Sequence, residues 1–280
     1  MVTQVEKNTE ERKNMVKSTS RAFSSCILFL AITGILQGEL ESQKKLLFFF
    51  DKIEVDGNVD VFLIKGKRLR EATIYADSEI ISSIKAEVSR KTLFIDANNT
   101  YNIARRLPFI KLKAERKYPV EIVISIDEIR EIRLLGQSNL TAQNLISEEI
   151  SLFMTSSGKL HIENINSNKL SIIHEGDGDI LLKGREVREL KVKISDNGSL
   201  YADELEVDRA TLIHQGNGIV HLNPKNWLDA RIHGSGNLFL HATPENLVID
   251  KQGSGSVKDI LPDSPPLYDL NATIQRFKKL

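Results

Sequence analysis

The sequence is poor in cysteine, proline and aromatic residues, and it carries no excess charge of either sign. Its single cysteine, Cys26, lies within an apolar run near the N-terminus, so removal of that run would leave a chain without a thiol. Such a chain can form no disulfide bond, cysteine-based metal site or cysteine nucleophile. Lys and Arg together number 38, as do Asp and Glu. This balance gives no support to nucleic-acid binding or to attraction of the whole chain to an anionic membrane.

Long hydrophobic runs are also lacking. The one candidate is AFSSCILFLAITGIL, residues 22–36, which is shorter than the roughly 20 apolar residues that a spanning helix needs. It follows a polar start that contains Lys and Arg and precedes GELESQKK, an order typical of a secretory signal peptide. We predict a signal peptide or N-terminal anchor region over residues 1–45, with cleavage near Gly38; initiation at Met15 would give a more ordinary signal length. If uncleaved, this segment is the part of the chain predicted to contact a membrane.

A short segment recurs at nearly constant spacing from Ser138 to Val257. Each copy is a turn followed by a strand-like stretch: GQSNLTA, TSSGKLHIE, EGDGDILLK, SDNGSLYAD, QGNGIVHLN, GSGNLFLH and GSGSVKD. The turn residues are Ser138, Gly158, Gly178, Gly198, Gly218, Gly236 and Gly255, at steps of 20, 20, 20, 20, 18 and 19 residues. Such a short, regular period is typical of stacked-repeat proteins.

Within each copy, apolar residues alternate with other residues, which is the pattern of a strand with one buried face. A second alternating strand follows in the same copy, as at Leu170 and Ile172. Helical solenoids need longer units, and the Asn/Cys ladder of leucine-rich repeats is missing. We therefore predict an all-β protein, a right-handed single-stranded parallel β-helix (a β-solenoid) with coils of about 20 residues. Its inner row would stack Ile180, Leu200 and Val220 on one another.

The chain divides into four parts on this interpretation. After the signal or anchor region, residues 46–133 are predicted as an irregular, strand-rich start of the same β-helix, in which Asp56-Gly57 is a turn dipeptide between two strands. Residues 134–261 are predicted as the regular repeats. Residues 262–280 begin with PDSPP and then place apolar residues at helical spacing, which predicts a short C-terminal helix that caps the last coil.

The turns have a regular composition. The residue before the turn glycine has a short side chain with an oxygen, as in Asp177, Asn197 and Asn217. Such side chains can bond to their own turn, and the glycine that follows is predicted to accept a positive φ. We expect these turns to shape corners rather than to bind phosphate, because no GxxxxGK[ST] motif occurs.

Several segments, taken in order, resemble one known family. The entry pattern FDKIEVDGNVDVFLIKG, the strand KTLFID, the bridge YPVEIVISIDEIREIRLLGQSNL and the serial GSG-like turns are similar to the head GIN domain family, labelled "putative auto-transporter adhesin". The resemblance covers about residues 48–260. It implies an exported bacterial β-helix protein, and it brings no catalytic residues with it.

One outward column is aromatic and apolar where a solvated face would carry short polar or charged residues. Three positions after the turn it holds Thr141, His161, Leu181, Tyr201, His221 and Phe239. We take the last five of these as a candidate binding stripe, because exposed apolar stripes often mark interaction surfaces. A stacked ladder that only stabilises the sheet explains the same residues equally well. As a binding stripe, it could serve either a protein or a carbohydrate ligand.

No catalytic, cofactor or metal site is predicted. His174 and His214 share a column, but Ile194 separates them, so corner packing is the better interpretation than metal binding. Charges on successive coils alternate in sign, as in Glu163, Lys183 and Asp203. This indicates a surface charge ladder rather than the closely spaced acid and base that glycan cleavage needs.

We therefore predict an exported, non-enzymatic protein of the periplasm, outer membrane or cell surface. It would be an adhesin-like or envelope-binding module whose flat faces bind an envelope partner, a surface protein or a glycan. A self-assembling scaffold like the bactofilins, whose rods join end to end, is the alternative, although the predicted cap and export signal argue against it. A polysaccharide-active enzyme is a weaker alternative, because units of about 20 residues leave no long loops to wall a cleft.

Overall fold

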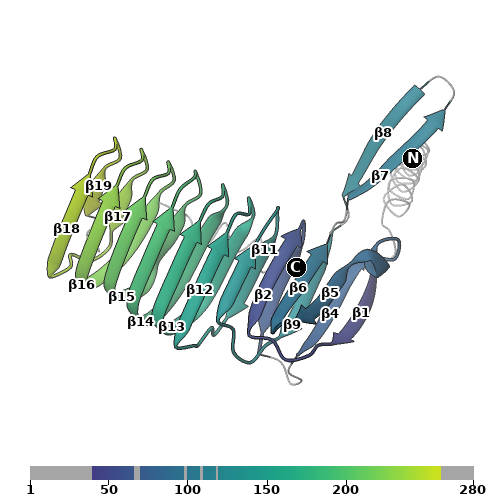
Figure 1. The fold of residues 1–280 in the computed structure, drawn as a ribbon, viewed down its shortest axis with the longest axis horizontal. Helices are drawn as coiled ribbons and strands as arrows, with labels where there is room; N and C mark the ends of the chain where they lie inside the picture. Colours follow the sequence, from purple (N-terminus) through teal and green to yellow (C-terminus); the bar gives the residue numbers. More distant parts are fainter. Residues whose placement is uncertain (1–39, 66–69, 98–99, 108–109, 118, 260–280) are drawn as a thin grey trace, which may run out of the picture.

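The computed structural model describes residues 40–65, 70–97, 100–107, 110–117 and 119–259, and it confirms a β-solenoid with stacked coils of about 20 residues (Figure 1). One 3₁₀ turn, η1 (Ile81–Ser83), follows the fourth strand. In chain order the strands are β1 (Leu40–Leu46), β2 (Lys52–Gly57), β3 (Asp60–Ile64), β4 (Glu71–Asp77), β5 (Lys85–Ser89), β6 (Thr92–Ala97), β7 (Thr100–Leu107), β8 (Ile110–Lys117), β9 (Glu121–Ser125), β10 (Glu131–Leu134), β11 (Asn139–Gln143), β12 (Glu149–Met154), β13 (Lys159–His174), β14 (Asp179–Ile194), β15 (Leu200–His214), β16 (Val220–Ile232), β17 (Leu238–Leu240), β18 (Asn246–Lys251) and β19 (Val257–Asp259).

Each regular coil has two flat sides that meet at a bend. Strands β13 to β16 run through the bend, where the register shifts, so each of them contributes to both sides. Ile180 pairs with Leu200 and Leu200 with Val220 in parallel register, so the predicted inner row exists. We call the outer surface of one side the first face; it is formed by segments 139–143, 159–162, 179–182, 200–202, 220–222, 238–240 and 257–259. We call the outer surface of the other side the second face; it is formed by segments 149–154, 169–174, 189–194, 209–214, 227–232 and 246–251.

Aliphatic side chains from both sides fill the interior. Ile180, Leu200 and Val220 from the first side, and Leu190 and Leu212 from the second, are all fully buried. Because side chains alternate along a strand, every second residue points inward, and its counterpart in the next coil lies about 4.8 Å away. Each buried side chain of this kind contributes roughly 1.5–3 kcal/mol, which makes the inner rows the main source of stability.

The turn glycines are needed for a reason other than the predicted one. Positive φ was expected at these turns, but Gly178 and Gly218 are not among the positive-φ residues of the described chain. A Cβ on Gly178 would instead collide with the carbonyl oxygen of Gly158, and one on Gly218 with that of Gly198. The positive-φ prediction is therefore wrong, because close approach of stacked coils, rather than a left-handed backbone, excludes a side chain here.

The short polar side chains before these glycines bond from coil to coil. Asn197 Nδ2 donates to Asp177 Oδ1 at 2.8 Å, and Asn217 Nδ2 donates to Asn197 Oδ1 at 2.9 Å. Ser235 continues the ladder through a hydrogen bond to Asn217. The expected partners were in the same turn, whereas parallel stacking places the side chain of the neighbouring coil within reach.

The N-terminal part contains antiparallel pairs that the repeats do not have. β1 pairs with β4, β4 with β9 and β5 with β6, all antiparallel, at one end of the solenoid (Figure 1). β2 and β3 flank Asp56-Gly57 but stack on different neighbours: β2 lies between β6 and β10, and β3 between β9 and β11. Asp56-Gly57 is thus a corner between two sides of a coil. The antiparallel strands cover edges that would otherwise be open to pairing.

β7 and β8 form a separate two-stranded antiparallel sheet. At the other end of the solenoid, the last described coil leaves Leu247 and Ile249 of β18 partly exposed. The predicted capping helix over residues 262–280, and residues 1–39 of the predicted signal or anchor region, lie outside the described residues. Within the described ranges, no helix is long and apolar enough to cross a membrane. The handedness of the coils stays a prediction.

Candidate functional site

The sequence-derived stripe occupies consecutive paired positions on the first face. The register connects Thr141, His161, Leu181, Tyr201, His221 and Phe239 across β11 and β13 to β17. The column continues to Phe62 of β3 in one direction and to Lys258 of β19 in the other. Its role as a binding stripe stays a prediction, and the packing of its members decides how much of it a ligand could reach.

Rings at the C-terminal end of this column cover one another. The ring centroids of His221 and Phe239 are 4.8 Å apart with an interplanar angle of 18°, and those of Tyr201 and His221 are 5.6 Å apart. His241 lies beside the column, with its Nε2 at hydrogen-bond distance, 2.8 Å, from His221 Nδ1. His221 is only 2% exposed and Phe239 only 8%. The side chains point outward, yet little of either ring is accessible.

The titration behaviour of the column reflects this burial. Burial lowers the pKa of His221 to about 4, against a favourable effect of the Asp203 charge on the protonated ring. Burial also lowers the pKa of His161, whose Nε2 lies 3.6 Å from Glu163 Oε1. At neutral pH these imidazoles are therefore uncharged and contribute ring surface rather than charge.

The second face carries an open hollow that the sequence interpretation did not identify. It has a volume of about 790 Å³, and Asn168, Lys169, Arg188, Asp208, Arg209 and Trp227 are among the residues that line it. Lys169, Glu189, Arg209 and Trp227 occupy consecutive paired positions across β13 to β16. Trp227 is 41% exposed, so a large part of its indole surface faces solvent. We call this hollow the Trp227 groove.

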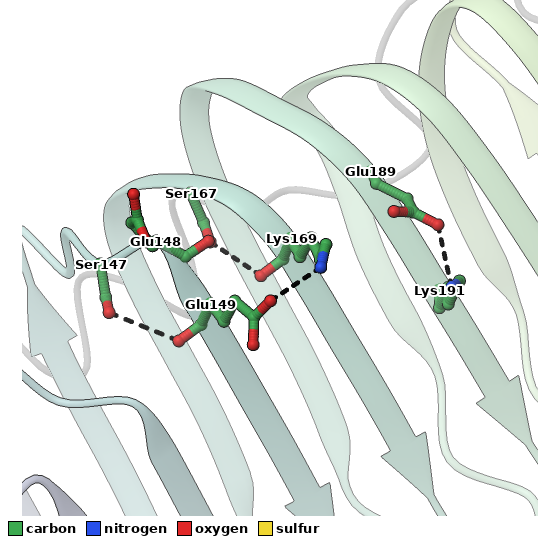
Figure 2. A network of polar contacts seen from close by, with 7 residues as sticks. All are labelled: Ser147, Glu148, Glu149, Ser167, Lys169, Glu189 and Lys191. Atoms are coloured by element: carbon green, nitrogen blue, oxygen red, sulfur yellow. Dashed lines mark hydrogen bonds and ion pairs between the residues drawn. The ribbon is translucent and has the colours of Figure 1, made fainter.

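Ion pairs and hydroxyl groups order the neighbouring part of the same face. Lys169 pairs with Glu149 and Lys191 with Glu189 (Figure 2), with Nζ–Oε1 distances of 2.8 Å and 2.9 Å. The Ser167 hydroxyl donates to the main-chain oxygen of Lys169 at 2.8 Å, where the strand leaves the bend (Figure 2). A second hollow of about 250 Å³ lies among these residues. The face is thus a row of paired charges beside an exposed indole.

The carboxylates of this row are ionised at neutral pH. The hydrogen bond from Lys169 lowers the pKa of Glu149, and that from Lys191 lowers the pKa of Glu189. A general acid for glycan cleavage needs the opposite shift, a raised carboxyl pKa beside a second carboxylate. The row is chemically suited to holding a polar ligand by hydrogen bonds rather than to donating a proton.

Trp227 was missed because its coil is shorter than the others. Counting 20 residues from Arg209 leads to Asp229, but the register shifts within β15 and β16 and pairs Arg209 with Trp227. A search for the single tryptophan would have found the residue. It would not have shown that the indole belongs to the same column as Lys169.

The corner histidines, His174 and His214, lie in buried surroundings typical of structural residues. His174 and His214 are fully buried, with Ile194 between them in the register. The His214 Nε2–H group donates to the Gly218 carbonyl at 2.9 Å, which is one reason its proton stays on that nitrogen. Burial lowers the pKa of His174 to about 4. Among the described residues, no three His, Cys, Asp or Glu side chains gather as a metal site would require.

Comparison with known proteins agrees with the β-solenoid fold. The family described as "Putative auto-transporter adhesin, head GIN domain" matches residues 49–244, which is more than half of the chain. The chain therefore belongs to the head GIN domain family, as the resemblance in the sequence indicated. No curated protein matches it.

Solved structures share the fold at low sequence identity. A "putative adhesin" of Bacteroides fragilis is 20% identical with a TM-score of 0.68, covering 80% of this chain and 98% of that one. A "putative adhesin" of Parabacteroides distasonis is 18% identical with a TM-score of 0.55, again covering 80% and 98%. A "putative lipid binding protein" of the same organism has the same identity, TM-score and coverage. At this identity the likeness shows the fold alone.

Proposed function

We propose that this protein is an exported, non-enzymatic, adhesin-like module that binds a surface glycan in the Trp227 groove. The observation that carries the proposal is the exposed indole of Trp227. It occupies the same outward column as Arg209 and Glu189, on a flat face built from paired strands. The family description supports an adhesin-like role with an external ligand. Neither that description nor the names of the similar structures include an enzymatic activity.

The chemistry of the groove suits a sugar better than an apolar ligand. An indole offers a flat apolar surface with a polar edge, which matches the C–H face of a pyranose ring. Arg188 and Arg209 present planar N–H donors, and Asp208 presents acceptors, within the same hollow. Neighbouring coils set Glu189, Arg209 and Trp227 about 4.8 Å apart, so a chain of sugars lying along the solenoid would meet a different polar or aromatic partner at each step.

The first-face stripe is a less suitable platform for the same ligand. His221 and Phe239 have almost no free ring surface, and the remaining members are only partly exposed. The stripe can still contribute as a rigid support, because its stacked rings hold the first face flat. We therefore assign ligand binding to the second face.

A glycan array probed with the full chain tests the proposal. Trp227→Ala should raise the Kd for any bound glycan at least about tenfold, as expected when an aromatic anchor is removed. The matched control is Phe94→Ala, because Phe94 is 40% exposed and lies on β6 at the other end of the solenoid. Equal losses in both variants, or glycan binding that ignores Trp227→Ala, would contradict the groove assignment. Surface-protease accessibility of the full chain in cells tests export.

A further inference from the structure

A second exposed aromatic site lies at the opposite end of the molecule from the Trp227 groove. Phe48 is 82% exposed, Phe49 is 51% exposed and Leu46 is 70% exposed. They lie at the end of β1 and in the segment that connects it to β2. In a chain with 6% aromatic residues, two adjacent phenylalanines exposed to solvent are unusual. We call Leu46, Phe48 and Phe49 the phenylalanine cluster.

The backbone holds this cluster in place. The Leu47 amide donates to the Arg70 carbonyl at 2.8 Å, and the Asp51 amide donates to the Lys91 carbonyl at 3.1 Å. On the far side of the segment, the Arg130 amide donates to the Asp51 carbonyl at 2.8 Å. The next residue along, Phe50, is 5% exposed and belongs to the core. The phenylalanine rings are therefore presented outward by a fixed connection.

Cationic residues border the cluster, and their backbone has the left-handed conformation that residues other than glycine rarely adopt. Arg70, Arg90 and Lys91 are all exposed, and all have positive φ, at 61°, 48° and 64°. Arg90 and Lys91 form the tip of the β5–β6 hairpin, where Asn-Gly or Asp-Gly would be the usual choice. A left-handed backbone costs a side-chain-bearing residue roughly 1–2 kcal/mol. The Lys91 ammonium lies 5.8 Å from the Phe49 ring centroid.

Two of the nearby carboxylates are engaged with other groups, whereas Asp51 Oδ1, in the connecting segment itself, is buried without a hydrogen-bond partner among the described residues. Glu71 lies 3.5 Å from Lys44 Nζ, and Glu128 accepts a hydrogen bond from Arg130 at 3.0 Å. The net result is a pair of open phenyl rings with a basic rim. This is the composition of a surface that enters the headgroup region of a membrane, where rings reach the acyl boundary and cations meet lipid phosphates.

We propose that the phenylalanine cluster and its rim of Arg70, Arg90 and Lys91 rest on a lipid bilayer with anionic head groups. If residues 22–36 remain as an uncleaved anchor, they bring the bilayer to this end of the solenoid, because that run precedes β1 by only three residues. A second copy of the chain fits the site poorly. Two-fold pairing through the cluster would set the three cations against the same three cations.

Membrane contact at this end would leave Trp227 several coils away from the lipid. β2 and β16 lie in the same stack, separated by β10, β12, β13, β14 and β15 (Figure 1). At about 4.8 Å a step, Trp227 lies on the order of 30 Å along the solenoid from β2, and the near edge of the groove, at Lys169 of β13, lies about half as far. The membrane proposal does not depend on the glycan proposal, because the two use different residues.

A single tryptophan moved into the cluster tests the proposal in the full chain. The variant Trp227→Phe with Phe48→Trp carries its one indole at position 48, and the wild type carries it at position 227. Each is mixed with vesicles of phosphatidylcholine and phosphatidylglycerol whose acyl chains are brominated. We expect a blue-shifted emission and about twofold or greater quenching at position 48, and no quenching of native Trp227.

A second pair of variants separates the parts of the site. In the same single-indole background, Arg90→Gln with Lys91→Gln should reduce quenching at position 48 and should weaken its dependence on phosphatidylglycerol, since Arg70 remains. Phosphatidylcholine vesicles alone should quench more weakly. If the vesicles bind the chain but leave position 48 unquenched, the proposal is wrong. A blue shift that depends on protein concentration and not on lipid would instead show self-association, and would also overturn it.

Discussion

The two faces of the solenoid use their outward side chains in opposite ways. On the first face, Tyr201, His221 and Phe239 stack on one another until the central ring is 2% exposed. On the second face, Lys169 and Trp227 occupy equivalent outward positions but stay open, with Lys169 paired to a carboxylate and 41% of Trp227 free. Both columns repeat at the same coil spacing, so period alone does not distinguish a support from a binding surface.

The difference arises from side-chain size and shape across a spacing of about 4.8 Å. Flat rings in adjacent coils can stack closely enough to exclude water from each other. Flexible charged side chains in adjacent coils pair through their ends and leave gaps between them, which become hollows such as the Trp227 groove. An outward column is therefore accessible to a ligand where neighbouring side chains differ in length and charge, and inaccessible where neighbouring side chains are stacked rings.

The largest expected effect tests whether the two faces share one interior. Leu200→Ala removes an inward side chain behind the first face, and Leu190→Ala does the same behind the second. Because both leucines are fully buried, each variant should lose about 2–5 kcal/mol of unfolding free energy, measured by urea denaturation. A nearly neutral Leu190→Ala would show that the faces already differ in their core.

The next effect separates the outward columns themselves. His221→Ala leaves a gap between Tyr201 and Phe239, and we expect it to lower the unfolding free energy by about 2 kcal/mol. Trp227→Ala removes a half-exposed ring and should cost less than about 1 kcal/mol. Urea denaturation of the two variants side by side gives the comparison. The distinction between a closed and an open column fails if Trp227→Ala is the more destabilising change.

The smallest effect is a pH dependence that belongs to the first face and the corners. The pKa values of His221 and His174 are both lowered to about 4 by burial, below the ordinary value near 6.5. Between these values the unfolded chain binds protons that the folded chain does not. Stability is therefore full above pH 6.5 and falls as the pH drops toward 4.

His221→Phe isolates one of these contributions. The phenyl ring can keep the stack between Tyr201 and Phe239 but cannot be protonated. Urea denaturation at pH 7.5, 6 and 5 should show a shallower loss of stability in the variant than in the wild type. This range lies above the ordinary carboxyl pKa values of about 4. Burial raises the pKa of Asp179, but both chains carry that residue, so its effect cancels in the comparison. Identical slopes would exclude His221 as a source of the pH dependence.

The register of the repeats was predictable because it depends on local alternation and on counting. Leu140 to Val257 recur at steps close to 20, and the inner rows follow directly from the parallel stacking of such units. The outward direction of His221 and Phe239 followed from the same alternation. Their burial did not, because it depends on contacts between rings of different coils and with His241.

The sequence by itself thus determined the fold class, the coil length and the inner rows, since parallel stacking in register buries the apolar face of every repeated strand. Only the tertiary structure decided three other matters. It paired Trp227 with Arg209 through a register shift, it placed the turn glycines against carbonyl oxygens of the preceding coil, and it left Phe48 outside the core. Each of these depends on distances between residues far apart in the chain, and a local pattern carries no information about those distances.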